Sequence, residues 1–262
     1  MVSCLATKSL TKHTQLLTYL LTCLLTYTHT HTNTTHIQVP HMIRKIVSLM
    51  ESCKPASIVE KIMKGEETEQ DIVDLNVAIH LVGPLISLTV VNGIPVTENQ
   101  IRVVREITQN STSVIVSRKE LLQYFGTAKE NKATNLSMKY FANITRLLGS
   151  CCQGKMNLAE ATCQEILSHE LCLSTIVSKE AKWSTKLTLI YFLYHVYLES
   201  STPVREMIYS KYMEKLINHF VVLVSFFFLL LFVFPLSLSL SLYLSISVFF
   251  SYTHTHTHTS VY

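Results

Sequence analysis

The middle of the chain, residues 42–220, carries apolar residues at helical spacing. In its first segment Ile43, Ile46, Val47 and Met50 recur three and four positions apart, which predicts one buried face of a helix. Further segments with this spacing follow, separated by short stretches rich in glycine, proline or polar residues. The pattern predicts a succession of amphipathic helices and no series of strands.

Glycine and proline predict where several of these helices begin and end. Pro55 suits the first turn of a helix, because a missing backbone N–H costs nothing there, and Gly65 suits the position after the last turn. The pair Gly83–Pro84 is expected to end the following helix, and Gly93 to mark a turn.

Polar pairs three residues apart predict further helix starts. In a capping box, the N-cap side chain and a Glu or Gln three positions later each bond the other's backbone N–H. The polar stretch 127–135 is expected to be a loop, and the helix after it to end at Gly149. The pairs are Thr97 with Gln100, Ser117 with Glu120, and Asn157 with Glu160.

The segment 183–209 has the broadest predicted apolar face. Thr202 is expected to cap a second helix with Pro203 at its first position, so the segment predicts a helical hairpin. The positions expected to be buried, with three tyrosines as the anchors of the packing, are Leu187, Ile190, Tyr191, Tyr194, Tyr197 and Leu198.

Both ends of the chain differ from the middle. Residues 1–41 are rich in Thr, Leu and His, and Thr-His alternation at 28–32 returns at 253–259. Ser-Leu alternation fills much of 237–247. A repeat of adenine and cytosine encodes Thr-His, and a repeat of thymine and cytosine encodes Ser-Leu. We therefore expect both ends to be low-complexity tails outside the native fold.

The stretch 220–250 is apolar and long enough to span a bilayer, although Pro235 and the Ser-Leu alternation interrupt it. This stretch predicts membrane contact. The expected organisation is a tail at 1–41, a helical domain at 42–219, the apolar segment at 220–250 and a Thr-His tail at 251–262.

Composition narrows the class of protein. Of 262 residues, 48% are apolar and 15% charged, with a formal net charge of +4 and no cluster of Lys and Arg, so nucleic acid is not an expected partner. Six glycines and six prolines favour helices over a turn-rich β fold. The seven cysteines have no paired ligand spacing, which is typical of reduced thiols in an intracellular protein.

The stretch Gly149–Met156 matches part of a phosphate-binding loop. That loop needs a strand before it and a Ser or Thr after its lysine, whereas here a helix precedes and Met156 follows Lys155. A turn between helices is the expected structure. An enzyme with a nucleotide site at 149–155 is kept as one alternative, beside the non-enzymatic functions considered below.

Other candidate chemistry rests on cysteines and histidines. Buried helical thiols usually behave as small apolar residues, and His169 and His195 are bases for a cysteine nucleophile only if the fold brings them together. No catalytic, cofactor or metal site is expected, and the chain is not expected to be an enzyme. The thiols considered are Cys151, Cys152, Cys163 and Cys172, and the glycosylation sequons start at Asn110, Asn135 and Asn143.

Two stretches resemble inositol trisphosphate receptors, the calcium-release channels related to ryanodine receptors. The likeness spans about 85–220 and lies in the family's large cytosolic helical region between the ligand-binding end and the pore. The matching residues are Leu147, Leu148, Cys152, Gly154 and Lys155 in the first stretch, and Tyr194, Tyr197, Glu206, Met207, Ile208 and Tyr209 in the second.

The resemblance implies an all-α, armadillo-like α-solenoid that relays ligand binding to the pore of a tetrameric calcium channel. Other regions and subunits of that channel would be its partners. The chain would lie at the endoplasmic reticulum membrane, with its helical domain facing the cytosol. Helical periodicity alone leaves a compact bundle open. The alternative function is an armadillo-like adaptor, soluble or membrane-tethered, that binds a protein partner.

Overall fold

The computed structural model describes residues 35–109, 111–115, 131–200, 205–218 and 220–221. These residues are mostly helical, so the all-α prediction is confirmed. The chain divides into two compact units, Met1–Ser210 and Lys211–Tyr262. This division falls inside the range 42–219 expected to form one domain.

The first unit contains the long helices and one short hairpin. In chain order the elements are α2 (Thr35–Cys53), α3 (Pro55–Lys64), α4 (Glu69–Thr89), β1 (Val90–Val91), β2 (Ile94–Pro95), α5 (Thr97–Gln109), α6 (Ser111–Val114), α8 (Lys132–Cys151), α9 (Asn157–Ile166), α10 (His169–Val177), α11 (Trp183–Leu193), the π-helix η1 (Tyr194–Leu198) and α12 (Arg205–Ile208).

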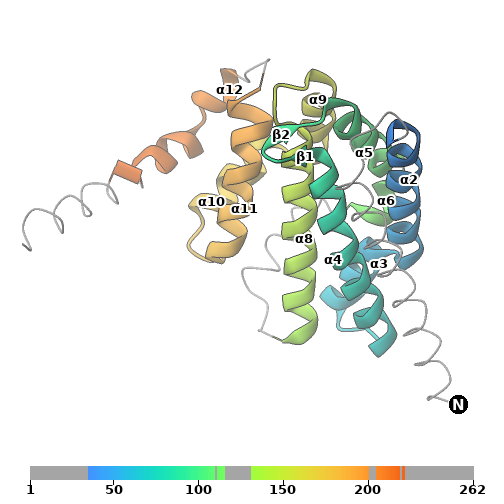
Figure 1. Ribbon diagram of the computed structural model, residues 1–262. Coiled ribbons are helices and arrows are strands. Elements are labelled where there is room, and N and C mark those ends of the chain that lie inside the picture. Colours follow the sequence, from blue (N-terminus) through green and yellow to red (C-terminus); the bar gives the residue numbers. More distant parts are fainter. Residues whose placement is uncertain (1–34, 110, 116–130, 201–204, 219, 222–262) are drawn as a thin grey trace, which may run out of the picture. The chain divides into compact units, whose positions relative to one another are not determined.

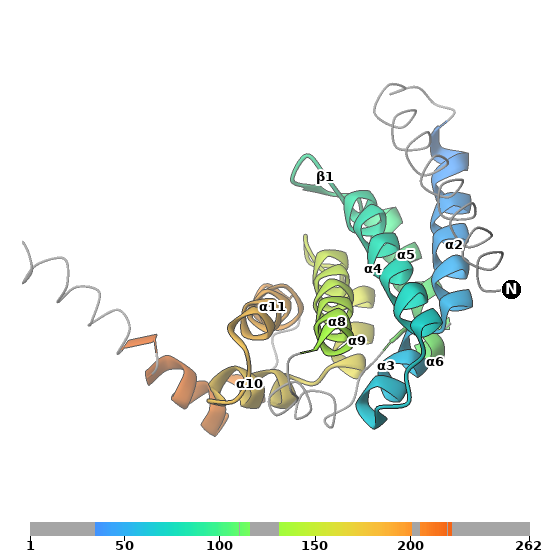
Figure 2. The same ribbon diagram turned by 90° about the horizontal axis from the view of Figure 1, so that it is seen from below.

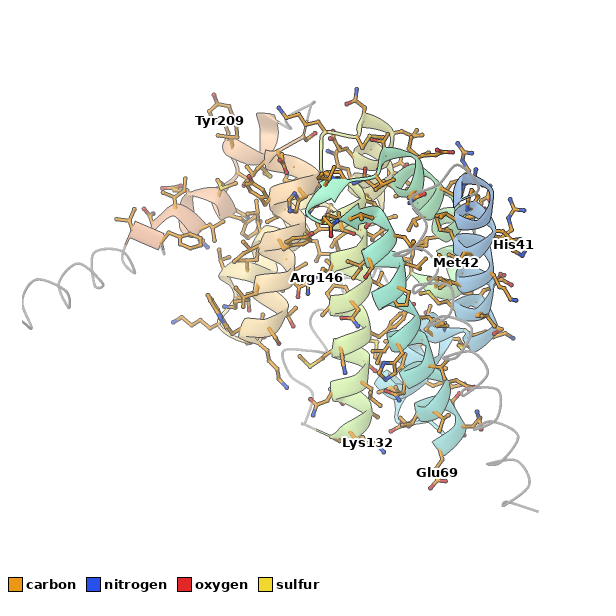
Figure 3. The ribbon with its side chains drawn as sticks, in the orientation of Figure 1. His41, Met42, Glu69, Lys132, Arg146 and Tyr209 are labelled. Carbon is orange, nitrogen blue, oxygen red and sulfur yellow. The ribbon has the colours of Figure 1, made fainter. Side chains whose placement is uncertain are left out.

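Helices α2, α4, α8 and α11 lie side by side in that order, as Figures 1 and 2 show from two directions. Figure 3 places Glu69 and Lys132 at the same end of the unit, so α4 and α8 start together and run the same way. Helix α5 packs against α2, α4, α8 and α9, and α10 packs against α11. The core therefore lies between the long helices and the shorter helices that pack against them.

The start of the unit follows the sequence closely. Ile43, Ile46, Val47 and Met50 are all buried on one face of α2, as predicted. Figure 3 shows the neighbouring residue Met42 turned toward the other helices and His41 turned outward.

The predicted limits of α3 are also confirmed. This helix starts at Pro55 and is closed by Gly65, whose φ of 72° lies in the left-handed region that glycine adopts without strain. Thr68 and Asp71 then form a capping box at the start of α4. The predicted turn after β1 is confirmed too, with Asn92 and Gly93 at φ of 52° and 79°.

The predicted end of a helix at Gly83–Pro84 is wrong, because α4 continues through Pro84 to Thr89. Proline inside a helix costs about 3 kcal/mol. Leu81 and Val82 before it, and Leu85 and Leu88 after it, are fully buried. At about 2 kcal/mol for each buried aliphatic side chain, packing on both sides of Pro84 outweighs that cost.

Helix α8 is longer than predicted at both ends. Asn131 caps it by accepting a hydrogen bond from Thr134 N at 2.7 Å, so the helix begins inside the stretch 127–135 expected to be a loop. It passes through Gly149 and ends at Cys151. Gly149 is therefore a packing position and not a helix end: a Cβ there would come within 2.9 Å of Tyr191 Cε1 on α11.

The predicted buried face of segment 183–209 is mostly wrong. Leu187, Tyr194 and Leu198 are exposed, and Ile190 and Tyr191 are half-buried. Of the six predicted positions only Tyr197 is in the core. Besides Tyr197, the side chains that α11 and η1 bury are Thr185, Leu189, Phe192, Leu193 and Val196.

Residues 211–218 of the second unit are helical. Within it Lys211 Nζ lies 5.1 Å from the centre of the Tyr212 ring, in cation–π contact. The predicted capping box at Ser117 and Glu120, the hairpin residues Thr202 and Pro203, residues 1–34 and 251–262, and the apolar stretch beyond Val221 lie outside the described residues.

Candidate functional site

The candidate site is a chain of polar side chains that joins α4, α5, the turn between α8 and α9, and the α11–η1 helix. We call it the polar network. Its members are separated by up to about a hundred residues in sequence, and hydrogen bonds connect them through Ser150, Gln100 and Gln153. Thr89, Gln100 and Ser150 are buried, and the other members are half-buried. The members are Thr89, Gln100, Ser150, Gln153, Tyr191, His195 and Glu199.

Gln100 holds the first half of the network. Its side chain is fully buried, and Nε2 donates to Ser150 O at 2.9 Å and to Gln153 O at 3.0 Å. The Ser150 hydroxyl in turn lies 2.9 Å from the hydroxyl of Thr89. The predicted capping box of Thr97 with Gln100 is therefore wrong: the amide satisfies carbonyls at the C-terminal end of α8 instead, where a helix leaves such groups unpaired.

Gln153 carries the network on to α11. Its Nε2 donates to Tyr191 Oη at 2.8 Å and lies 3.3 Å from His195 Nε2. His195 Nδ1 lies 2.7 Å from Glu199 Oε2. An imidazole that donates from Nδ1 to the carboxylate and accepts at Nε2 satisfies both contacts. Both ring nitrogens of His195 are thus engaged by protein groups.

The turn that carries Gln153 is the stretch that matches part of a phosphate-binding loop. Helix α8 leads into it, and Gly154 and Lys155 follow in left-handed conformations with φ of 83° and 63°. The turn joins α8 to α9, as expected. Its backbone packs against the hairpin, since a Cβ on Gly154 would lie 3.3 Å from Pro95 Cγ.

A second set of polar contacts follows the π-helix. In a π-helix the backbone hydrogen bond spans five residues, one more than in an α-helix. Here Glu199 N donates to Tyr194 O at 2.7 Å, five residues back. Gln164 Nε2 donates to Val196 O at 2.9 Å, and Tyr197 Oη donates to Leu167 O at 2.8 Å. The irregular turn is therefore fixed to α9 through side chains.

Glu160 on α9 is fully buried and accepts a hydrogen bond from Ser200 Oγ at 2.8 Å. The predicted capping box of Asn157 with Glu160 is wrong, because α9 has Met156 at its N-cap and no side-chain cap bond there. A buried carboxylate requires partners, and the tertiary contact with Ser200 supplies one.

The four thiols considered as candidates are all buried in the core. Burial raises the pKa of Cys151 and Cys172 well above the ordinary value, and a hydrogen bond with Cys163 together with burial raises that of Cys152. A thiol held in its protonated form is a poor nucleophile. His169 lies edge-on to the Tyr197 ring at 5.6 Å, so its contact in the structure is aromatic.

The remaining sequence candidates fall on helices or outside the described residues. Asn135 and Asn143 lie within α8, and Asn110 is not described. Among the described residues no group of three or more His, Cys, Asp or Glu side chains is placed to hold a metal ion. In the same residues α4 alone has the length and hydropathy of a membrane span, and it packs against α2, α3, α5 and α8.

The sequence pattern did not single out Gln100 and Gln153 as members of the polar network, or Glu160 as the partner of Ser200. Each is a polar residue next to a predicted helix end, where a local capping role is the usual explanation. The signal that sets Gln100 apart is its place on the apolar face of α5, four residues before Val104 and beside Val103, both buried. No protein-family model matches the chain.

Proposed function

We propose that this chain is a helical relay segment of an intracellular calcium-release channel resembling the inositol trisphosphate receptor. In this proposal the chain is not an enzyme. It binds neighbouring helical segments of a tetrameric channel at the endoplasmic reticulum membrane and transmits conformational change between them.

One observation carries the proposal: the α11–η1 helix is apolar on two opposite faces. One face packs in the core through Phe192, Val196 and Tyr197. The other face exposes Trp183, Leu187, Tyr194 and Leu198. A helix that is apolar all round is normally covered on all sides. The exposed face is therefore one on which a larger helical assembly would continue.

The order of the helices supports an armadillo-like solenoid within that assembly. Helices α4, α8 and α11 lie side by side (Figure 2). The shorter helices α5, α9 and α10 pack against α4, α8 and α11, respectively. In a solenoid each helix pair buries its apolar face only against neighbouring pairs, so a terminal pair has an uncovered face. The outer face of α11 has this property.

The residues that carry the resemblance support a structural role. Leu147, Leu148 and Cys152 are buried, Gly154 shapes the turn after α8, and Tyr197 is in the core. The polar network links the same turn to α11. A displacement of α11 would be transmitted to α5 through Gln153 and Gln100, and a relay requires such a connection.

The test is to sequence the transcript across the Asn218–His219 junction. The channel proposal expects the message to continue into further helical segments and then a pore. If the Ser-Leu and Thr-His codons are present in the message, the channel proposal fails. An armadillo-like adaptor, tethered to a membrane by 220–250, would then explain the uncovered face.

A further inference from the structure

We infer that the outer face of α11–η1 docks an amphipathic helix with acidic flanks, supplied by another polypeptide segment. The inference names a partner class for the assembly proposed above and rests on that proposal. We call this face the outer stripe. Its members are Trp183, Leu187, Tyr194 and Leu198, with exposed fractions of 62%, 49%, 51% and 53%.

The outer stripe is unusual within its unit. Nine large apolar side chains are exposed among the described residues of Met1–Ser210, and six of them lie at or after Trp183. The other three, Val73, Ile94 and Leu158, lie on separate elements and need no partner. A cluster of exposed apolar side chains marks an interaction surface.

The spacing of the stripe favours a helix as the occupant. Its members, with half-buried Ile190 between them, follow at intervals of four, three, four and four residues. This interval pattern places side chains in one narrow row, which is the geometry of helix-in-groove recognition. A bilayer surface would favour a broader apolar face than this single row.

The charges beside the stripe favour an acidic partner. Lys179 is exposed just before Trp183, and Lys186 projects from α11 one turn later, where its Nζ also donates to Ser178 O. Arg146 on α8 is exposed on the side of α8 that faces α11, and it acts electrostatically on Tyr191 (Figure 3).

The acidic groups in the same region are fewer or already paired. Glu180 is exposed beside Lys179, and Glu199 is bonded to His195. The border is therefore positive on balance. Lys186 borders the stripe on the side of α10 and Arg146 on the side of α8. Carboxylates on the two flanks of a partner helix would meet these charges, and this pairing would orient the partner and raise its rate of association.

Trp183 is the only tryptophan of the chain, so its fluorescence reports on the stripe directly. The experiment titrates the full chain with a synthetic helical peptide that has leucines at positions i, i+3, i+4 and i+7 and glutamates on both flanks of this row. A control peptide of the same length carries lysines in place of the glutamates. The inference expects a blue shift of Trp183 emission and protection from iodide quenching with the acidic peptide, at a Kd about tenfold lower than that of the basic one.

Two variants test the location of binding. Leu187→Glu places a charge in the middle of the stripe and is expected to abolish the response to the acidic peptide. Val73→Glu, at an exposed position on α4, is the matched control and is expected to leave the Kd unchanged. Circular dichroism establishes that both variants keep the helical content of the parent chain.

The inference is overturned if neither peptide shifts the emission, or if both bind equally well. It is also overturned if anionic vesicles alone shift the emission, which would identify a membrane as the occupant. A shift that depends on protein concentration without peptide would identify a second copy of the chain. These outcomes leave the transcript test untouched, so failure of the partner class and failure of the proposed function are distinguishable.

Discussion

Tyr194 and Tyr197 lie three residues apart on one helix and have opposite environments. Tyr197 is 2% exposed and Tyr194 is 51% exposed. The Tyr197 ring contacts Phe192 edge-on at 6.3 Å, and its hydroxyl donates to Leu167 O. Tyr194 contacts His195, its neighbour in sequence, at 4.9 Å. The helix is therefore anchored through Tyr197.

Replacing each tyrosine by alanine should separate the two environments. Tyr197→Ala removes a buried ring and leaves Leu167 O without this donor, and we expect a loss of about 3–5 kcal/mol in the free energy of unfolding. Tyr194→Ala, the matched control, should cost less than about 1 kcal/mol. Urea denaturation measures both. Equal losses would contradict the register of α11–η1 described above.

Gly149 and Gly83 provide a second comparison between residues of the same type. Both lie inside helices, where alanine is favoured over glycine by about 1 kcal/mol. Apart from its chain neighbours, a Cβ at Gly83 would meet nothing within 4 Å, whereas one at Gly149 would press against Tyr191. The ring of Pro84 disfavours helical backbone at a preceding residue that has a Cβ, and this cost opposes the gain in helix propensity. Gly83→Ala should therefore change stability by less than about 1 kcal/mol.

Gly149→Ala should instead destabilise the protein. Overpacking costs about 1–3 kcal/mol, which exceeds the gain in helix propensity, and displacement of the Tyr191 ring also weakens its hydrogen bond with Gln153. Thermal unfolding of the two variants measures the difference. A stabilising Gly149→Ala would show that α8 and α11 pack less closely than the structure has them.

At the level of single elements, the N-terminus of α4 is stabilised by residues that are close to it in sequence. Thr68 and Asp71 cap each other's backbone N–H groups, at 2.9 and 3.2 Å, and Lys61 Nζ lies 2.9 Å from Asp71 Oδ1. Burial alone would raise the pKa of Asp71. The hydrogen bonds from Lys61 and Thr68 outweigh burial, so the pKa lies below its ordinary value of 3.8.

This lowered pKa predicts how stability depends on pH. A carboxyl whose pKa is lower in the folded state stabilises the protein above the unfolded pKa of about 3.9, and this contribution is lost as pH falls through the folded value. Asp71→Asn should remove that part of the acid dependence and lower stability at pH 7. Asp74→Asn is the control, because Asp74 is on the same helix, is half-buried and accepts a hydrogen bond from the neutral Gln70 side chain. Urea midpoints between pH 2 and 7 measure both, and identical profiles would contradict the ion pair.

The α11–η1 helix shows what irregularity does within an element. The extra residue of the π-turn rotates the face that follows it, so that Val196 and Tyr197 both remain in the core after Phe192 and Leu193. Gln164 satisfies the carbonyl of Val196. The irregular turn is therefore held by tertiary contacts.

At the scale of the first unit, α4 and α8 occupy the middle of the row of long helices (Figure 1). Helix α8 contacts α3, α4, α5, α9 and α11, whereas α12 is a short helix near the end of the unit. Amides that open only on global unfolding exchange slowest. Native-state hydrogen exchange should show the strongest protection in the middle of α4 and α8 and weak protection in α12. Slower exchange in α11 than in α8 would contradict this order.

Local sequence patterns predict the helical class and most helix positions. Features that depend on neighbours a few residues away can be predicted from the sequence. Examples are the apolar spacing of α2, the proline and glycine at the ends of α3, and the turn at Gly93. The same is true of the turn after α8. The four candidate thiols were expected to be buried, and Cys151, Cys152, Cys163 and Cys172 are all in the core.

The packing of the helices decided which face of α11 is buried, because apolar residues lie on opposite sides of that helix and its periodicity does not distinguish them. It also decided that α4 passes through Pro84, since packing against α8 outweighs a local penalty. Gln100, Gln153 and Glu160 look like capping residues in the chain, but their partners lie 38 to 53 residues away. Such partners exist only once α5, α8, α9 and α11 have packed together.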